Sequence, residues 1–270
     1  MKLVNRELRE SSDASAARGT AFKELRRLLV YAAILALVVY VIIATVVDLV
    51  VARISYETEA KLFQSARLEK WIPEEKSNPR LVEAQSILDQ LGTSPEVPPL
   101  PYRLILLENE CPNAFAFPGG MIGITSGLLD LLTEEIEFAF VLGHELGHFY
   151  HRDHLRGIGR AVGVGITFAI IFGGQMGSDS LGDSVQYVLD RRYSRAQEDA
   201  ADDFGIALVY HTYGRTEGVD RLFQILEESD SMPSWAYMFS THPDPSDRIR
   251  NLKNFVDAMM SETDSPAGDG

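Results

Sequence analysis

The residues His144-Glu145-Leu146-Gly147-His148 combine two histidines and a glutamate at a spacing that supports metal chemistry. They lie inside an apolar segment that runs from residue 136 to residue 150. On a helix, residues four apart share one face, so both imidazoles can bind the same ion. Glu145 then lies beside the ion, where a base is needed to deprotonate a bound water. The pattern predicts hydrolytic chemistry at a site for one Zn²⁺ per chain.

The sequence offers His154 as one candidate for the third ligand. A catalytic zinc needs three protein ligands and one open position. His154 would complete a metzincin pattern, but that pattern has a glycine where this chain has His151, and the glycine turns the chain back towards the metal. On a straight helix, His154 lies about 15 Å along the axis from His144. We therefore expect His151 and His154 to form a polar helix end.

The other candidate lies on a helix predicted over residues 184–210. Glu198 and Asp202 are four residues apart and so share one face of that helix. A glutamate completes a His₂Glu zinc site, and an aspartate can accept the second ring N–H of a zinc-bound histidine. Asp199 and Asp203 also permit a solvated acidic face. Beside the upstream motif, we favour Glu198 as the ligand and Asp202 as its supporting acid.

A membrane anchor is predicted over residues 28–47, which carry no charge. Twenty residues of helix span about 30 Å, the thickness of a bilayer core. A cleaved signal peptide is the alternative, but its apolar region is shorter, at about 7–15 residues. Five basic residues lie within about 20 residues before the span, so the positive-inside rule predicts a cytoplasmic N-terminus. The rest of the chain then lies outside the cytoplasm, and if the cell is Gram-negative, this compartment is the periplasm.

A second apolar stretch, residues 161–174, is short and rich in glycine. We expect it to be buried or to dip into the membrane beside the active site, because it is too short to span comfortably. If it did span, Glu198 and His144 would lie on opposite sides of the bilayer. The predicted zinc site therefore requires that this stretch does not cross.

The pattern along the chain predicts an α+β fold that is mostly helical with one small sheet. Strands are predicted over 102–107, 113–117 and 121–125, with a turn at 118–120. The net charge of −14 argues against a nucleic-acid partner, and the single Cys111 excludes an internal disulfide. The predicted organisation is a cytoplasmic segment (1–27), the anchor (28–47), juxtamembrane helices and a linker (53–101), a metallopeptidase domain (102–260) and a flexible tail (261–270).

Four sequence blocks resemble the HtpX-like and CAAX-prenyl-protease-like membrane-linked zinc metallopeptidases, which are gluzincins. The chain is most similar to short bacterial members with one anchor, and the blocks are 112–120, 141–148, 194–202 and 240–249. The resemblance implies a zincin-type domain with zinc ligands at His144, His148 and Glu198, a general base at Glu145 and an orienting acid at Asp202. It also implies endopeptidase action on misfolded or membrane-associated envelope proteins. The tetratricopeptide repeats that some relatives carry for docking are not recognised. The several spans of the prenyl-processing members are not recognised either, so CAAX processing is not expected.

Two further predictions concern the substrate. Residues Asn113, Ala114, Phe115 and Ala116 form a predicted edge strand that could hold an unfolded or extended peptide through main-chain hydrogen bonds. The alternative is a plain core strand. His242 could stabilise the oxyanion or bind zinc as a fourth ligand, or it could simply begin a helix before Pro243. Competing functions are a zinc-stabilised chaperone or adaptor and a different metal hydrolase.

Overall fold

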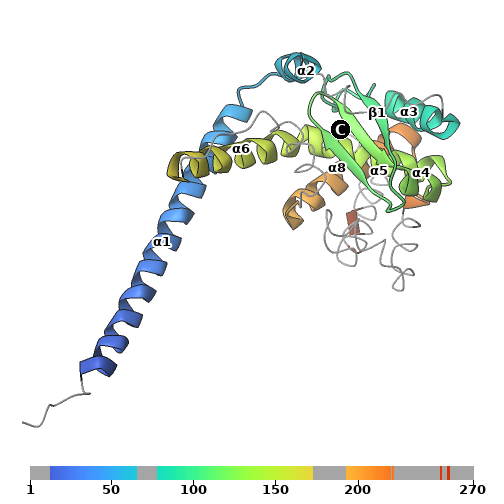
Figure 1. Cartoon of the computed structure of the whole chain (residues 1–270). Helices are drawn as coiled ribbons and strands as arrows, with labels where there is room; N and C mark the ends of the chain where they lie inside the picture. The colour runs from blue at the N-terminus through green and yellow to red at the C-terminus, as the bar shows by residue number, and fades with distance from the viewer. Residues whose placement is uncertain are drawn as a thin grey trace, which may run out of the picture.

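The computed structural model describes residues 13–65, 78–172, 193–219, 221, 250 and 254–255. A helical body encloses a small sheet, and one long helix projects from it (Figure 1). The predicted α+β class with a mostly helical content is confirmed. The elements are α1 (Asp13–Val51), α2 (Tyr56–Ser65), α3 (Pro79–Leu91), β1 (Arg103–Leu107), β2 (Ala114–Phe117), β3 (Met121–Thr125), α4 (Ser126–Leu131), α5 (Glu135–Tyr150), α6 (Asp153–Phe172) and α8 (Arg195–Tyr213).

Helix α1 is the projecting element, and it contains the whole predicted anchor. It begins at Asp13, so the helix extends well into the segment expected to precede the anchor. Alanine, leucine, lysine, arginine and glutamate are abundant between residues 13 and 27, and these are good helix formers. Most large apolar side chains between residues 28 and 50 are exposed. This helix is therefore long and apolar enough to cross a membrane and is not a core helix of the body.

The sheet has the strand order β1-β3-β2, so β2 lies at one edge. Strand β1 pairs in parallel with β3, whereas β2 pairs antiparallel with β3. The three predicted strands are all present, each within one residue of its expected start. Gly119 and Gly120 form the turn between β2 and β3 with positive φ values of 83° and 89°. Such values favour glycine, which explains why these residues occupy the turn.

Helix α5 forms the centre of the body and packs against α8, α3 and β2. Nearly all its side chains are buried, which explains the apolar run around the histidines. Its N-terminal cap is Glu134, in a capping box with Glu137. Helix α3 and the buried Val97 and Leu100 belong to the same core. The core therefore includes residues that the sequence placed before the metallopeptidase domain.

Candidate metal centre

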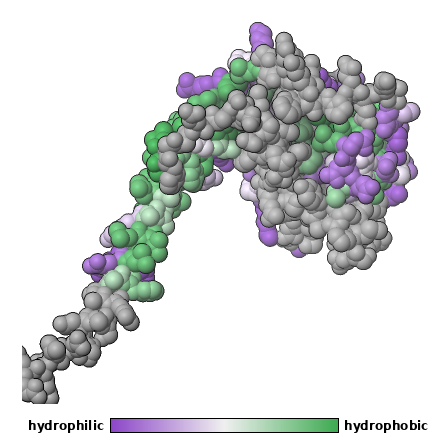
Figure 2. All heavy atoms as spheres, in the orientation of Figure 1, coloured by the Kyte–Doolittle hydropathy of each residue, from purple (hydrophilic) through white to green (hydrophobic). Residues whose placement is uncertain are grey.

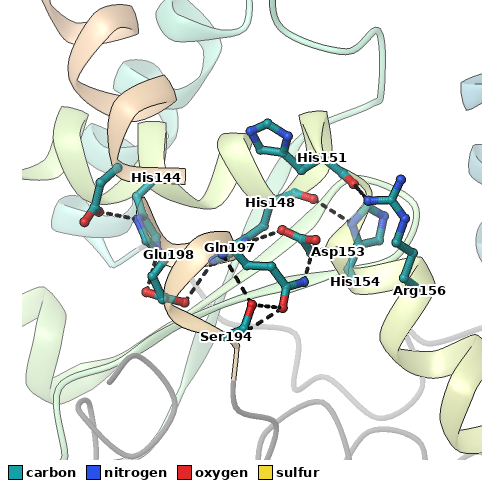
Figure 3. A network of polar contacts seen from close by, with 10 residues as sticks. His144, His148, His151, Asp153, His154, Arg156, Ser194, Gln197 and Glu198 are labelled. Atoms are coloured by element: carbon teal, nitrogen blue, oxygen red, sulfur yellow. Dashed lines mark hydrogen bonds and ion pairs between the residues drawn. The ribbon is translucent and has the colours of Figure 1, made fainter. Parts of the chain in front are cut away.

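Three side chains from two helices converge on one point. His144 and His148 project from the same face of α5, and Glu198 comes from the first turn of α8 (Figure 3). The Nε2 atom of His144 lies 3.6 Å from Oε2 of Glu198, and Nε2 of His148 lies 3.6 Å from Oε1. One ligand atom from each residue lies within 4.8 Å of the other two. All three side chains are buried.

These distances fit a shared metal ion better than direct hydrogen bonds. A separation of 3.6 Å is too long for a hydrogen bond. Ligand atoms bound tetrahedrally at about 2.1 Å from zinc lie about 3.4 Å from one another. The donor set, two imidazole nitrogens and a carboxylate oxygen, is also one that zinc accepts. The group can therefore hold a divalent metal ion without rearrangement of the two helices.

Each of the two histidines has its own carboxylate on the ring nitrogen that points away from Glu198. The Nδ1 atom of His144 lies 2.8 Å from Oδ1 of Asp202, and Nδ1 of His148 lies 3.1 Å from Oδ2 of Asp153. An Nδ1–H that donates to a carboxylate leaves the Nε2 lone pair available for a metal. Asp202 occupies the place expected from the sequence, whereas Asp153 was not predicted.

The reason Asp153 was missed lies in the chain between α5 and α6. On a continuous helix, Asp153 would lie on a different face from His148. Helix α5 instead ends at Tyr150, and Arg152 adopts the left-handed conformation with a φ of 56°. This turn directs Asp153 back to the histidine. The expected polar helix end is therefore a sharp corner, made without the glycine of the metzincin pattern.

His154 does not lie at the end of α5 with His151, as expected, but is buried in the first turn of α6. Its Nε2–H donates to Oε1 of Glu59 at 2.8 Å, and its Nδ1 lies 3.3 Å from the carbonyl oxygen of His148. Among the described residues, the metal group consists of His144, His148 and Glu198 without His154. The rejection of His154 as third ligand is consistent with this geometry.

Glu59 attaches the short helix α2 to this corner. It is completely buried and accepts a hydrogen bond from the backbone N–H of Gly119 at 3.1 Å, in addition to the His154 contact. Arg152 lies 3.5 Å away and also covers the ring of Tyr56. Burial alone would raise the pKa of Glu59, but His154, Gly119 and Arg152 together hold that pKa below its usual value of 4.5. Through the Glu59 side chain, helix α2 is hydrogen-bonded both to the β2–β3 turn and to the corner between α5 and α6.

The start of α8 is fixed by a capping box that also reaches the metal centre. The side chain of Ser194 accepts from the backbone of Gln197, and the Gln197 side chain returns to the backbone of Ser194. The same glutamine donates from Nε2 to Oδ1 of Asp153 at 2.6 Å. Tyr193 stacks on His148 with ring centroids 3.8 Å apart. Tyr193 and Ser194 are not helical, so α8 begins at Arg195, and the first part of the helix predicted over 184–210 lies outside the described residues.

Helices α5 and α8 meet with their backbones in close contact. A Cβ atom on Gly143 would lie 3.1 Å from the Cα of Gly205, and one on Gly147 would lie 2.9 Å from the Cα of Ala201. Small residues at both crossing points therefore allow Glu198 to approach the two histidines. Larger side chains would separate the helices that carry the three ligands.

The centre concentrates negative charge in a buried place. Glu145, Glu198, Asp153 and Asp202 are all buried around the two imidazoles. Within the described part of the chain, Oε2 of Glu145 has no hydrogen-bond partner. Buried carboxylates are costly unless they are paired or bind a metal. A divalent cation would offset this charge, which agrees with the fit of the ligand distances.

The imidazoles respond differently to this environment. Burial lowers the pKa of His144 despite its hydrogen bond to Asp202. Burial also opposes the charged form of His148, but the hydrogen bond to Asp153 and the carboxylates of Glu198 and Glu145 outweigh it and raise its pKa to about 9. Carboxylates approach both histidines at each ring nitrogen, but Glu145 further raises the pKa of His148, whereas the charge of His148 lowers that of His144.

The structure describes some of the remaining predicted site residues but not all of them. Asn113, Ala114, Phe115 and Ala116 are buried on and beside edge strand β2, which packs against α5. Thr125 Oγ1 accepts from the backbone N–H of Asn113 at 2.8 Å and fixes the start of the strand. His242 lies outside the described residues, as does the predicted tail.

The fold and the two-histidine, one-glutamate group together define a metallopeptidase, and comparison with known proteins gives its family. The chain belongs to peptidase family M48, whose sequence model matches residues 80–256. The predicted family resemblance and the predicted class of enzyme, a zinc metalloendopeptidase, are confirmed by this membership.

Several bacterial proteins that are named as proteases are similar to this chain. The chain is 27% identical to metalloprotease YcaL of Escherichia coli, over 63% of this chain and 67% of that protein. It is 28% identical to metalloprotease LoiP of the same species, over 64% of this chain and 69% of the relative. A protease HtpX homologue of Desulforapulum autotrophicum is 29% identical, over 62% of this chain and 67% of its own length.

Proposed function

We propose that this chain is a membrane-anchored endopeptidase in which His144, His148 and Glu198 hold one zinc ion and Glu145 is the general base. The observation that carries the proposal is the convergence of the three ligand atoms, each histidine being oriented by its own buried acid. Zinc, when bound there, supplies a Lewis acid that polarises a carbonyl and lowers the pKa of water to about 7.

Glu145 is suited to move the proton in this reaction. It occupies the turn of α5 between the two histidines and is buried, and its Oε2 has no hydrogen-bond partner among the described residues. It accepts a proton from the attacking water at Oε2 as the water adds to the peptide carbonyl. The same oxygen then gives the proton to the leaving amine. Asp153 and Asp202 keep both imidazoles in the tautomer with the proton on Nδ1.

Strand β2 is the proposed place for the substrate backbone. Its position at the sheet edge supports pairing with an extended peptide along Asn113, Ala114, Phe115 and Ala116. Main-chain hydrogen bonds recognise an extended backbone and depend little on its side chains. The proposed substrates are therefore protein segments that are unfolded or locally extended.

The proposed location is the cell inner membrane, with α1 as a single-pass anchor. The basic residues before residue 28 favour a cytoplasmic N-terminus and an extracytoplasmic catalytic domain. Membrane lipid is then a partner of the anchor. A protease in this place would act on misfolded or membrane-associated envelope proteins, and we propose a role in their quality control.

The decisive experiment is substitution Glu145→Gln in the full-length protein. The variant should bind zinc like the wild type, because Glu145 is not a ligand, but should not cleave casein or an unfolded protein. Glu108→Gln, at an exposed glutamate outside the centre, is the matched control and should retain full activity. Full proteolysis by Glu145→Gln would refute the assignment, and proteins retained by this variant would identify substrates.

His242 is the remaining proposed participant. Both of its proposed roles, oxyanion stabilisation and zinc ligation in a resting state, require that it reaches the centre. If His242 stabilises the oxyanion, His242→Ala should lower kcat while the zinc content of the purified protein stays unchanged; if it binds zinc in the resting state, the same variant should bind zinc less tightly. Unchanged kcat together with unchanged zinc affinity would assign His242 to the start of a helix instead.

A further inference from the structure

Helix α6 carries an exposed apolar surface that begins directly after its charged first two turns. Residues 153–160 include Asp153, Arg156 and Arg160, whereas residues 161–172 carry no charge. The large side chains at Val162, Ile166, Phe168, Ile170 and Ile171 are all exposed, and Ile170 is 77% exposed. In this second half, the hydroxyl of Thr167 bonds to the carbonyl oxygen of Gly163 within the helix. A surface of this kind suits an apolar solvent.

The same part of α6 packs directly against α1. A Cβ atom on Gly159 would lie 2.7 Å from the side chain of Val47, and one on Gly163 would lie 2.5 Å from that of Ile43. The contact on α1 therefore moves from Val47 back to Ile43 as α6 proceeds from Gly159 to Gly163, so the two helices are antiparallel here. Helix α6 thus leaves the body, advances towards the N-terminal end of α1 and crosses it near the C-terminal end of the predicted anchor (Figure 1).

Charges mark the level at which the apolar region begins. Asp48 is the first charged residue after the uncharged run of α1. It lies 3.0 Å from Nη2 of Arg160 and 3.5 Å from Nε of Arg156. These three residues form a polar level between the two helices, and Gly163 lies on its apolar side. Figure 2 shows hydrophobic surface on α1 that continues into the region where α6 crosses it.

We propose that the second half of α6, from Gly163 to Ile171, is embedded in the lipid bilayer beside α1, with acyl chains as the partner of its exposed face. The proposal rests on the membrane anchoring by α1 proposed above. Continuity with the lipid-facing surface of α1 favours lipid over a protein partner. These nine residues extend about 13 Å, less than half of a bilayer core of about 30 Å, so α6 enters the membrane without crossing it.

The position of the metal centre supports this entry without a crossing. Asp153, the first residue of α6, and Tyr193, which follows the helix in sequence, both contact His148. The chain is therefore on the same side of the bilayer before and after this segment. Arg160 is seven positions beyond Asp153 on α6, so the metal centre lies on the order of 10 Å from the polar level.

Fluorescence quenching by lipid tests the proposal in the full-length protein reconstituted into phosphatidylcholine vesicles. Single cysteines at Ile170→Cys on α6, Val41→Cys on α1 and Tyr150→Cys on the body are introduced into a Cys111→Ser background and labelled with NBD. Ile166→Cys provides a second α6 position. Lipid spin-labelled on its acyl chain should quench the probes at positions 170, 166 and 41 at least threefold more than the probe at position 150.

Two other results would overturn the proposal. Quenching at position 41 but not at positions 170 and 166 would leave the anchor in place and show that α6 lies outside the lipid. If the unquenched Ile170→Cys protein also formed disulfide-linked dimers on oxidation, a second copy would be the occupant of this face. Absence of quenching at all three positions would refute both the membrane entry of α6 and the proposed anchor.

Discussion

The substitution Asp153→Asn tests whether the acid missed in the sequence is as important to the metal centre as the acid that was predicted. Asp153 accepts hydrogen bonds from His148 Nδ1 at 3.1 Å and from Gln197 Nε2 at 2.6 Å. Both partners are donors. An asparagine offers one oxygen and one NH₂ group, so it can accept from only one of them. The NH₂ group of the asparagine would then face the N–H of the other partner, which leaves two hydrogen-bond donors opposed in a buried site.

The expected magnitude follows from the role of such acids. Removal of a carboxylate that orients a metal-bound histidine lowers metal affinity about 10- to 100-fold. This corresponds to about 1.4–2.7 kcal/mol of zinc-binding free energy. Asp202→Asn should have an effect of similar size, because Asp202 lies 2.8 Å from the Nδ1 atom of the other histidine.

Competition with a fluorescent zinc chelator measures the affinity of each variant directly. Asp203→Asn is the matched control, because it removes the same charge from an exposed position one residue from Asp202. Its zinc affinity should stay within about twofold of the wild type, since no metal ligand depends on it. Proteolysis by Asp153→Asn should recover when zinc is supplied in excess. Equal zinc affinities for Asp153→Asn and Asp203→Asn would refute the orienting role.

Three further predictions concern helix packing, pH and metal removal. Gly147→Ala should destabilise the fold by about 1–3 kcal/mol in urea unfolding, because its Cβ would meet Ala201 at 2.9 Å. The control is Gly165→Ala, whose Cβ would meet open space and should not lower the free energy of unfolding. At neutral pH, Glu59→Gln should lower the free energy of unfolding by about 1.5–3 kcal/mol, because a charged hydrogen-bond acceptor is removed. Since the folded pKa of Glu59 is lowered, the wild-type advantage should be complete above the usual value of 4.5 and disappear as pH falls through the lowered pKa. A difference that is constant from pH 7 to pH 3 would contradict this. A chelator should abolish proteolysis, and free zinc at 100 times its Kd should restore it and raise the free energy of unfolding by about 2.7 kcal/mol; unaltered cleavage without metal would contradict the proposal.

Local patterns predicted much of this structure from the sequence. The three strands were recognisable because each apolar run ends at a turn signal, and the placement of Glu198 and Asp202 on one helix face follows from their spacing alone. The histidine motif needed only one helix. Each of these predictions depends on residues within a few positions of one another, where the periodicity of the backbone determines which side chains meet.

The features that escaped prediction depend on contacts between distant segments. Asp153 reaches His148 only because Arg152 adopts a left-handed conformation, which no glycine announces. Glu59 lies 95 residues before its partner His154, and nothing near either residue indicates the pairing. Helix α6 was not assigned over its full length because its glycines weaken the local signal. In the structure, Gly159 and Gly163 are explained by the approach of α1.

The close contact between α5 and α8 changes how the five-residue motif can be interpreted. Gly143 and Gly147 each precede a metal-binding histidine by one position, and they meet Gly205 and Ala201, which are also four residues apart. Two matched pairs of small residues thus set the register of one helix against the other. Small residues directly before and within a histidine motif therefore also indicate where the helix that carries the distant glutamate crosses the motif helix. In sequences that lack an obvious third ligand, a matching pair of small residues on a later helix, three and seven positions beyond an acid, gives a physical basis for finding it.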